Sequence, residues 1–261
     1  MTVRRKRFGQ HFLHDPAVLS RILQAVDPQP DDLLLEIGPG SGALTELLLQ
    51  QQRRLDVIEI DRDLAAALRS RHPDRLVVHE GDALKFDYAG LAAQRGGRLR
   101  IVGNLPYNIS TPLLFRLLED LPHIRDLHVM LQREVVDRMA AAPGSGDYGR
   151  LTVMLSPQLQ IDKLFEVGPG AFRPPPRVWS AVARLTVLPE PRYVVTAAFR
   201  QVVAAAFSHR RKTLRNALRT LVPEEAFAAC NIDPGARPET LAPAQFAALA
   251  VLAQSPQPVI L

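Results

Sequence analysis

Short apolar runs recur along the first half of the chain, and each is followed by polar residues or glycine. Five of these runs have the length of buried strands; they are residues 33–37, 55–60, 76–79, 99–102 and about 127–131. Between them the spacing is helical, and Asp15-Pro16 is a typical N-cap and first position for a helix that runs to Val26. This alternation predicts an α/β fold, a doubly wound and mostly parallel sheet with helices on both faces.

The second half of the chain has a different pattern. Strand-like segments at about residues 159–167 and 178–188 predict a closing hairpin for the sheet, and the Pro-Glu-Pro sequence at 189–191 is the best linker candidate. Ala- and Leu-rich stretches beyond it predict a small all-α domain; they are residues 196–221, 224–230 and 243–253. We therefore expect a sheet domain at residues 1–188 and a small helical domain at residues 189–261.

Composition limits the classes of function. With 261 residues, of which 47% are hydrophobic, the chain can bury a full core and hold one large domain and one small one. The single cysteine, Cys230, cannot form an internal disulfide, and no Cys or His cluster has the spacing of a metal site. No apolar run has the length of a membrane span. We expect a cytoplasmic protein that binds neither a metal nor a membrane.

The net charge of +5 is concentrated at the two ends of the chain. Residues 4–7 are all basic, and residues 189–261 contain eight basic and five acidic residues. Three arginines of the second region recur at i, i+4 and i+8 of an expected helix, a pattern typical of nucleic-acid binding but also of a solvated basic face. The candidate RNA contacts are Arg210, Arg211, Lys212, Arg215 and Arg219.

The sequence Asn104-Leu105-Pro106-Tyr107 follows the fourth predicted strand and contains an amide, a carbonyl and an aromatic ring. The exocyclic amine of adenine is a poor nucleophile because its lone pair is delocalised into the ring. The Asn104 side-chain oxygen and the Leu105 carbonyl could each accept one of its N–H bonds, while Pro106 restricts the backbone and Tyr107 stacks on the base. A strand end closed by a proline turn, with a core tyrosine, is the competing interpretation.

A glycine-rich turn and two carboxylates follow the earlier strands. Gly38 and Gly40 come directly after the first strand, Glu59 ends the second, and Asp82 follows the third. A carboxylate at the end of the second strand can accept both hydroxyls of a ribose, which indicates a nucleoside ligand. The pattern G-x-G-x-x-A also fits a dehydrogenase with a nicotinamide cofactor, but such an enzyme leaves the Asn104 sequence unexplained.

Five motifs, in order, resemble those of the ribosomal small-subunit RNA adenine dimethyltransferases. They are RFGQHFL at residues 7–13, EIGPGSG at 36–42, GNLPYNISTP at 103–112, FRPPPRV at 172–178 and SHRRKTLRN at 208–216. The resemblance implies a Rossmann-like methyltransferase that uses S-adenosylmethionine to place two methyl groups on N6 of each of two adjacent adenines. These adenines lie in the 3′-terminal hairpin loop of 16S rRNA, within a small-subunit ribosomal particle. We expect the protein to act on that particle as a monomer.

The resemblance also implies which residues form the site. The implied cofactor contacts are His11, Leu13, Gly38, Glu59, Asp82 and Asn104. Phe172 is the candidate for the second face of the target base, with a plain core position as the alternative. The attacking nitrogen becomes acidic as it bonds carbon, so no dedicated general base is expected.

Two departures from the family pattern and two related functions stay open. His11 stands where the commoner residue is Asn, and Trp179 where it is usually Asp. One alternative function is that of the large-subunit rRNA adenine-N6 methyltransferases of the antibiotic-resistance type, which typically have Ile at the position of Leu105. The other is that of a non-catalytic nucleic-acid-binding relative, in which parts of the pocket would be lost.

Overall fold

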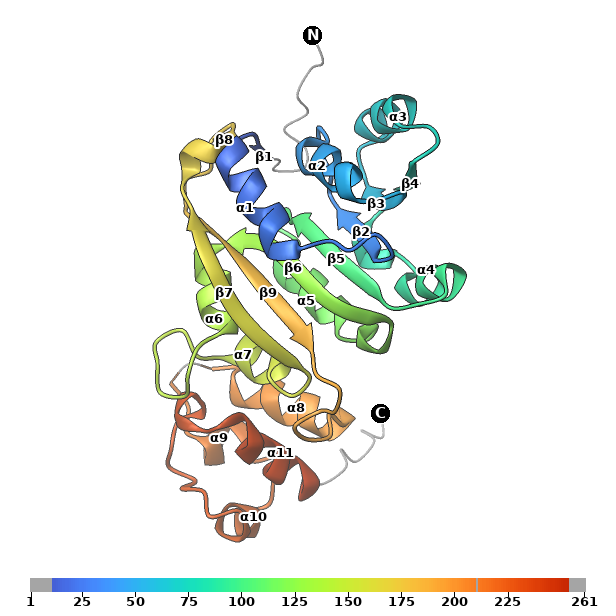
Figure 1. The fold of residues 1–261 in the computed structure, drawn as a ribbon. Helices are drawn as coiled ribbons and strands as arrows, with labels where there is room; N and C mark the ends of the chain where they lie inside the picture. Colours follow the sequence, from blue (N-terminus) through green and yellow to red (C-terminus); the bar gives the residue numbers. More distant parts are fainter. Residues whose placement is uncertain (1–10, 210, 254–261) are drawn as a thin grey trace. The chain divides into compact units, whose positions relative to one another are not determined.

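The computed structural model describes residues 11–209 and 211–253 (Figure 1). The chain divides into two compact units, which are described separately. Unit 1 consists of Met1–Val136 and Ile161–Val187, and unit 2 of Asp137–Gln160 and Leu188–Leu261. The basic residues 4–7 and the candidate RNA contact Arg210 lie outside the described residues.

Unit 1 is built on a seven-stranded sheet with the order β4-β3-β2-β5-β6-β9-β7. The strands are β2 (Leu33–Ile37), β3 (Leu55–Glu59), β4 (Leu76–Glu80), β5 (Leu99–Asn104), β6 (Ile124–Gln132), β7 (Leu159–Val167) and β9 (Ser180–Val187). The five strands from β4 to β6 are parallel to their neighbours, and β9 is antiparallel to β6. The predicted α/β class and its mostly parallel sheet are therefore confirmed.

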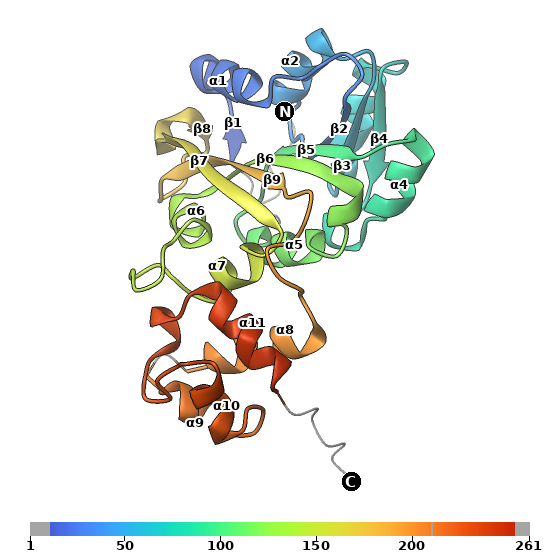
Figure 2. The same cartoon turned by 60° about the horizontal axis from the view of Figure 1, so that its bottom comes forward.

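Helices cover both faces of this sheet, as Figure 2 shows for α1 and α2 on one face and α5 on the other. The helices are α1 (Pro16–Val26), α2 (Ala43–Gln51), α3 (Arg62–Arg71), α4 (Tyr88–Arg95) and α5 (Ser110–Leu117), with short 3₁₀ turns η2 (Ala83–Lys85), η3 (Leu121–His123) and η4 (Pro169–Ala171). Helix α1 begins as predicted, because Asp15 Oδ1 accepts hydrogen bonds from the amides of Ala17 and Val18 at 2.8 and 3.1 Å.

A second, two-stranded sheet joins distant parts of unit 1. Strand β1 (Phe12–Leu13) pairs antiparallel with β8 (Phe172–Arg173), so that Phe12 faces Arg173 and Leu13 faces Phe172. The chain before α1 is thereby held beside the segment that precedes β9.

The side chain of Arg100 ties the end of α1 to the sheet. It lies on β5, is nearly completely buried, and donates from Nε to both carboxylate oxygens of Asp126 at 3.1 and 3.0 Å. One terminal nitrogen bonds to Asp32, and the other donates to the carbonyl oxygen of Val26 at 2.7 Å. These hydrogen bonds pair the donors of the guanidinium, which would destabilise the fold if it were buried without partners.

Unit 2 is helical in the part that the structure describes. Its helices are α7 (Arg150–Leu155), α8 (Ala197–Ala206), α9 (Leu214–Leu218), α10 (Glu224–Ala229) and α11 (Pro243–Val251), with the 3₁₀ turn η5 (Pro238–Thr240); α6 (Arg133–Met139) spans the boundary with unit 1. Residues 137–160 belong to this unit although they precede β9. They are held there by bonds such as that from the Tyr148 hydroxyl to the Leu241 carbonyl, at 2.7 Å. The roles expected for residues 1–188 and 189–261 stay predictions.

The expectation that Arg211, Arg215 and Arg219 lie on one helix is wrong. Helix α8 ends at Ala206, and α9 begins only at Leu214. The amides of Leu214 and Arg215 donate to the carbonyls of Ala236 and Pro234, both at 2.9 Å, so a loop distant in sequence sets the start of the second helix. Arg211 therefore lies before α9 and does not share a helical face with Arg215.

Replacing Arg100 by Met should lower the free energy of unfolding by about 3–5 kcal/mol, because the buried Asp126 loses its closest cation and Asp32 keeps only the exposed Arg125. The matched control is Arg184→Met: Arg184 is half-exposed, pairs with Asp162 at 2.9 Å, and should cost less than about 1 kcal/mol. Urea unfolding followed by circular dichroism measures both. Equal losses in the two variants would show that the buried network adds nothing.

Candidate active site

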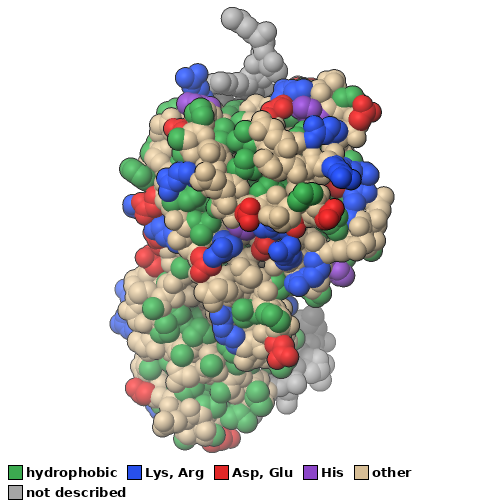
Figure 3. Space-filling model, in the orientation of Figure 1, with side chains coloured by type: hydrophobic (Ala, Val, Ile, Leu, Met, Phe, Trp, Pro, Cys, Tyr) green, Lys and Arg blue, Asp and Glu red, His purple; other side chains and the backbone are tan. Residues whose placement is uncertain are grey.

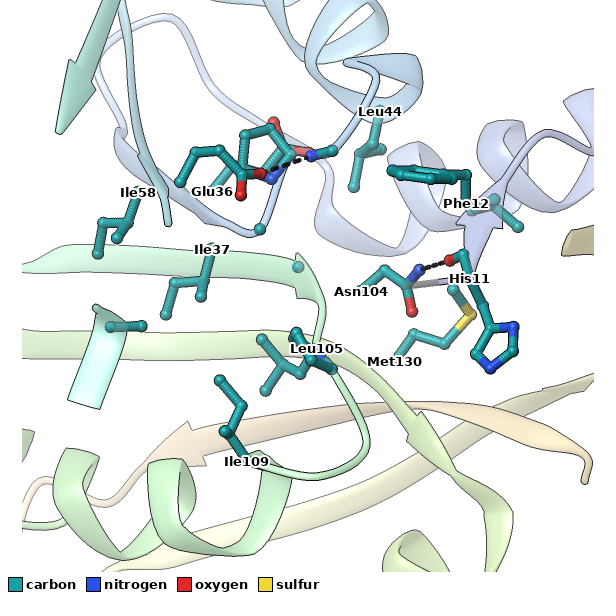
Figure 4. A pocket seen from close by; sticks show the side chains of 18 of the residues that line it. His11, Phe12, Glu36, Ile37, Leu44, Ile58, Asn104, Leu105, Ile109 and Met130 are labelled. Carbon is teal, nitrogen blue, oxygen red and sulfur yellow. Dashed lines mark hydrogen bonds between the residues drawn. The ribbon is translucent and has the colours of Figure 1, made fainter. Parts of the chain in front are cut away.

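A cavity of about 210 Å³ lies in unit 1 at the carboxyl ends of β2, β3, β4 and β5. Parallel strands bring these ends to one edge, where open α/β sheets bind ligands. Most of the residues predicted from the sequence line this cavity together; they are His11, Leu13, Gly38, Glu59, Asp82, Asn104, Leu105, Pro106 and Tyr107. Figure 4 shows part of the lining, including the side chains of Phe12, Asn104 and Met130.

The turn after β2 passes close to the β1 segment. Gly40 has a φ of +57°, and a Cβ at this position would lie 2.9 Å from the Phe12 ring. A side chain therefore has no room there. The turn instead presents backbone to the cavity, as the approach of a ligand requires.

Glu59 is held by the same turn. One carboxylate oxygen accepts from the Gly40 amide at 3.1 Å, and the other from the Asp61 amide at 2.9 Å. Burial raises the pKa of this carboxyl, and the two amide bonds oppose that effect in part. Each oxygen keeps a lone pair that can accept a further hydrogen bond.

A second carboxyl, that of Glu36, also lines the cavity and was not predicted as a site residue. Its side chain is buried and accepts from the Thr45 hydroxyl at 2.6 Å. Burial raises its pKa to about 7, and the nearby Glu59 adds to the effect. Its place as the one acid in the apolar strand 33–37 was the signal that could have identified it.

Asp82 lies after β4 and caps the turn η2. Its Oδ1 accepts from the Leu84 amide at 2.9 Å, and the Tyr88 hydroxyl donates to the neighbouring Ala83 carbonyl at 2.8 Å. These bonds fix the carboxylate at the cavity and leave its second oxygen for a ligand amine.

The amide of Asn104 is oriented by the backbone of residue 11. Its Nδ2 donates to the His11 carbonyl at 3.0 Å, and its oxygen faces away from this bond (Figure 4). The side chain therefore offers an acceptor to the cavity. Among the described residues, none donates to the carbonyl of Leu105, the next residue along this edge.

Tyr107 and His11 form a pair of rings with centroids 5.6 Å apart. The Tyr107 hydroxyl is hydrogen-bonded to the Ser180 hydroxyl at 2.7 Å, and His11 Nδ1 donates to the Pro174 carbonyl at 2.7 Å. Burial raises the pKa of the Tyr107 hydroxyl. Because the Tyr107 hydroxyl is already hydrogen-bonded within the protein, the face of the ring is the part of Tyr107 that can contact a base.

Phe172 does not line the cavity. It is 2% exposed and belongs to the hydrophobic core with Leu13, Val167 and Ala171. The structure thus places it in the core position that was its alternative. A contact with the base would need the side chain to leave this position, so its stacking role stays a prediction without support from the cavity.

Other lining residues were missed by the sequence analysis. Ile60 and Ala83 follow the two carboxylates directly and could have been found from that spacing, whereas His128 on β6 carried no signal. Among the described residues, neither ring nitrogen of His128 has a hydrogen-bond partner, and Nδ1 lies 3.5 Å from Asp126 Oδ1. Its side chain is buried.

No group of three or more His, Cys, Asp or Glu side chains is arranged to hold a metal ion within residues 11–209 and 211–253. In the same part of the chain, no helix combines the length and the hydropathy needed to cross a membrane.

Comparison with known proteins gives consistent matches over most of the chain. The sequence model of the family described as "Ribosomal RNA adenine dimethylase" matches residues 1–255. "Ribosomal RNA small subunit methyltransferase A" of Pseudomonas aeruginosa is 54% identical over 250 residues, which is 94% of this chain and 93% of that protein. The protein of the same name from Aromatoleum aromaticum is 52% identical over 97% of this chain and 96% of its own length.

Two solved structures have a similar fold. A dimethyladenosine transferase from Plasmodium falciparum has a TM-score of 0.79 and 25% identity, covering 93% of this chain and 99% of that one. The 23S rRNA methyltransferase ErmE has a TM-score of 0.68 and 30% identity, covering 92% of this chain and 98% of that one.

Replacing Glu59 by Ala should weaken the binding of S-adenosylhomocysteine at least about tenfold, because each hydrogen bond to a charged group is worth roughly 1.5–3 kcal/mol. Binding needs the ionised carboxylate, whose pKa is raised. The affinity should therefore fall as the pH is lowered through this raised pKa and recover above it, and the variant should keep only the dependence that Glu36, with its pKa of about 7, contributes.

The matched control is Glu80→Ala. Glu80 is the register partner of Glu59 on β4, but it is exposed and does not line the cavity. Isothermal titration calorimetry between pH 5 and 8 gives the dissociation constants. A constant that is unchanged in Glu59→Ala would remove Glu59 from the cofactor site.

Proposed function

Since this chain belongs to the ribosomal RNA adenine dimethylase family, we propose that it dimethylates N6 of two adjacent adenines in the 3′-terminal hairpin loop of 16S rRNA. It is an rRNA methyltransferase, and its cofactor is S-adenosylmethionine. The proposed substrate is the small-subunit particle. The assignment of adenine N6 as the methylated atom rests on how the cavity can hold an amine.

The residues of the cavity fit the cofactor. The turn at Gly40 leaves backbone where a Cβ would meet the Phe12 ring, and Glu59 retains acceptor capacity for a ribose diol. Asp82 offers an acceptor for the amino group of the cofactor's adenine. When bound, the cofactor supplies an electrophilic methyl group on a positively charged sulfur.

The orientation of Asn104 is the observation that carries the proposal. Its nitrogen is bonded to the His11 carbonyl, so its oxygen can accept one N–H of the target amine, and the Leu105 carbonyl can accept the other. Two acceptors favour a pyramidal nitrogen, whose lone pair is then free to attack. Preorganised dipoles of this kind stabilise the charge that develops in the transition state. The Tyr107 ring would hold the base by stacking.

The target base must leave its stack to reach this cavity. Unpaired loop nucleotides are extruded at the smallest cost, and they are where sequence-specific RNA recognition usually occurs. A hairpin loop therefore suits the cavity better than a duplex.

We assign the RNA backbone contact to exposed basic residues of unit 2. Arg211, Lys212, Arg215 and Arg219 are all exposed, and Arg215 also forms an ion pair with Glu224 at 2.6 Å. On the face of unit 1 drawn in Figure 3, by contrast, basic side chains are interleaved with acidic ones. Phosphate contacts position an RNA, whereas the cavity selects the base.

The test of this function uses small-subunit particles that lack the modification, incubated with labelled S-adenosylmethionine. The label should appear as dimethyladenosine at two adjacent positions of the 3′-terminal hairpin loop. Methylation of large-subunit RNA instead would support the antibiotic-resistance type of activity. Absence of transfer to either RNA would support a non-catalytic role.

Asn104→Ala should lower the single-turnover rate at saturating cofactor by about two orders of magnitude, as expected for loss of one preorganised polar partner of a transition state. Because the same amide can also contact the cofactor, its dissociation constant must be measured for the variant and saturation verified. A near-normal rate under those conditions would contradict the role of Asn104 as an acceptor for the amine.

The four basic residues assigned to the RNA backbone should determine part of the salt dependence of RNA binding. Changing Arg211, Lys212, Arg215 and Arg219 to Gln should flatten the log–log slope by up to about three, since each phosphate contact contributes about 0.7–0.9. A double change of the exposed Arg53 and Arg54, which precede β3, serves as the control and should leave the slope unchanged. An unaltered slope in the fourfold variant would transfer the contact to the basic residues 4–7.

A further inference from the structure

Trp179 is the one tryptophan in the sequence, and half of its side chain is exposed. It precedes β9 and is preceded by Val178, which is also exposed. The ring lies close to Gly168, since a Cβ built on that glycine would lie 3.6 Å from Trp179 Cη2. Large aromatic side chains stabilise a fold mainly through burial, so half of this ring contributes nothing to the core of unit 1.

The segment that contains Trp179 is bonded at both ends to the rings beside the target-base site. Near its start, the Pro174 carbonyl accepts from His11 Nδ1, and directly after its end Ser180 is hydrogen-bonded to the Tyr107 hydroxyl. Consecutive Cα atoms are about 3.8 Å apart, which places the Trp179 Cα within about 10 Å of that hydroxyl. A nucleic-acid strand covers this distance in about three nucleotides, at roughly 3.4 Å each.

The charge of the segment that contains Trp179 suits a polyanion. Arg177 is exposed, and it has no ion pair with any residue that the structure describes. Both acids of strand β7 are already paired: Glu166 with Lys163 at 2.8 Å and with Arg133 at 3.6 Å, and Asp162 with Arg184 at 2.9 Å. A half-exposed indole in the same segment as an exposed guanidinium without an ion pair is a combination that proteins use to hold unpaired nucleotides.

A protein partner fits this surface less well. Stable protein interfaces bury about 800 Å² on each side, around a core of several apolar anchors. In the described part of unit 1, the exposed large apolar side chains are Ile60, Val178 and Trp179, which is fewer than such a core requires.

We propose that Trp179 stacks on an RNA base close to the target adenine and holds the strand while Tyr107 holds the target itself. This inference rests on the proposed function. Stacking tolerates any base, so Trp179 contributes affinity and register, and the cavity contributes selectivity for adenine.

Fluorescence gives a direct readout, because emission from a single tryptophan reports this position alone. The probe is a hairpin RNA with the 3′-terminal loop sequence, labelled at its stem, and titrated in the presence of S-adenosylhomocysteine. Tryptophan emission should be quenched with the same dissociation constant as the label anisotropy, and a blunt duplex with as many phosphates should leave it unchanged. Hairpin binding with unaltered emission overturns the proposal.

Methylation of unmodified particles tests the same residue on the full substrate. Trp179→Ala should raise KM about tenfold with kcat nearly unchanged, and Trp179→Phe, which retains a ring, should remain within about threefold of the parent. Val178→Ala is the control for lost apolar surface and should have no effect. The melting temperature and cofactor affinity of all variants should match those of the parent.

The outcomes separate the two proposals. If the unaltered chain transfers methyl groups and Trp179→Ala has the same KM, only the stacking role is overturned, whatever the hairpin titration gives. If the unaltered chain transfers none, the proposed function fails and the stacking role with it. An equal rise in KM for the Ala and Phe variants also overturns stacking, because a ring is still present in the latter.

Discussion

The site depends on the close approach of β5 to β2 at the end of the sheet. A Cβ on Gly103 would lie 2.5 Å from the Ile37 carbonyl oxygen, so no side chain fits between the two strands at this point. The approach puts Asn104, the next residue, beside the turn that follows β2. Strand β2 lies between β3 and β5 and is parallel to both. The direction in which successive strands join the sheet reverses at β2, and the cavity lies at the carboxyl ends of the strands at this switch point.

The acceptors of the site are oriented by backbone groups from elsewhere in unit 1. The carbonyl of His11 fixes the amide of Asn104, and the amides of Gly40 and Asp61 fix the carboxylate of Glu59. Such partners cost little reorganisation when a ligand binds, because the fold has already ordered them. The pairing of β1 with β8 holds residue 11 in place, so this small sheet supports the chemistry without touching the reacting atoms.

Two buried carboxyls line a cavity that is proposed to receive a positively charged sulfur. Burial raises the pKa of both Glu36 and Glu59, and each is stabilised by hydrogen bonds that it accepts. A cation in the cavity would favour their ionised forms. The electrostatics of the site therefore matches a charged cofactor better than its neutral product.

Much of this protein was determined by local sequence. The five apolar runs formed strands, Asp15 capped α1, and the strand ends carried the glycines, carboxylates and Asn104 that line the cavity, because strand length, capping and turns depend on neighbouring residues. Other features needed the tertiary structure. The bond between Asn104 and His11 joins residues 93 apart, the bond between Tyr107 and Ser180 joins residues 73 apart, and Phe172 packs in a core assembled from several strands and helices. The interruption between α8 and α9 likewise arises from bonds to residues 234 and 236. No local pattern specifies such contacts, because they exist only once separate segments have packed together.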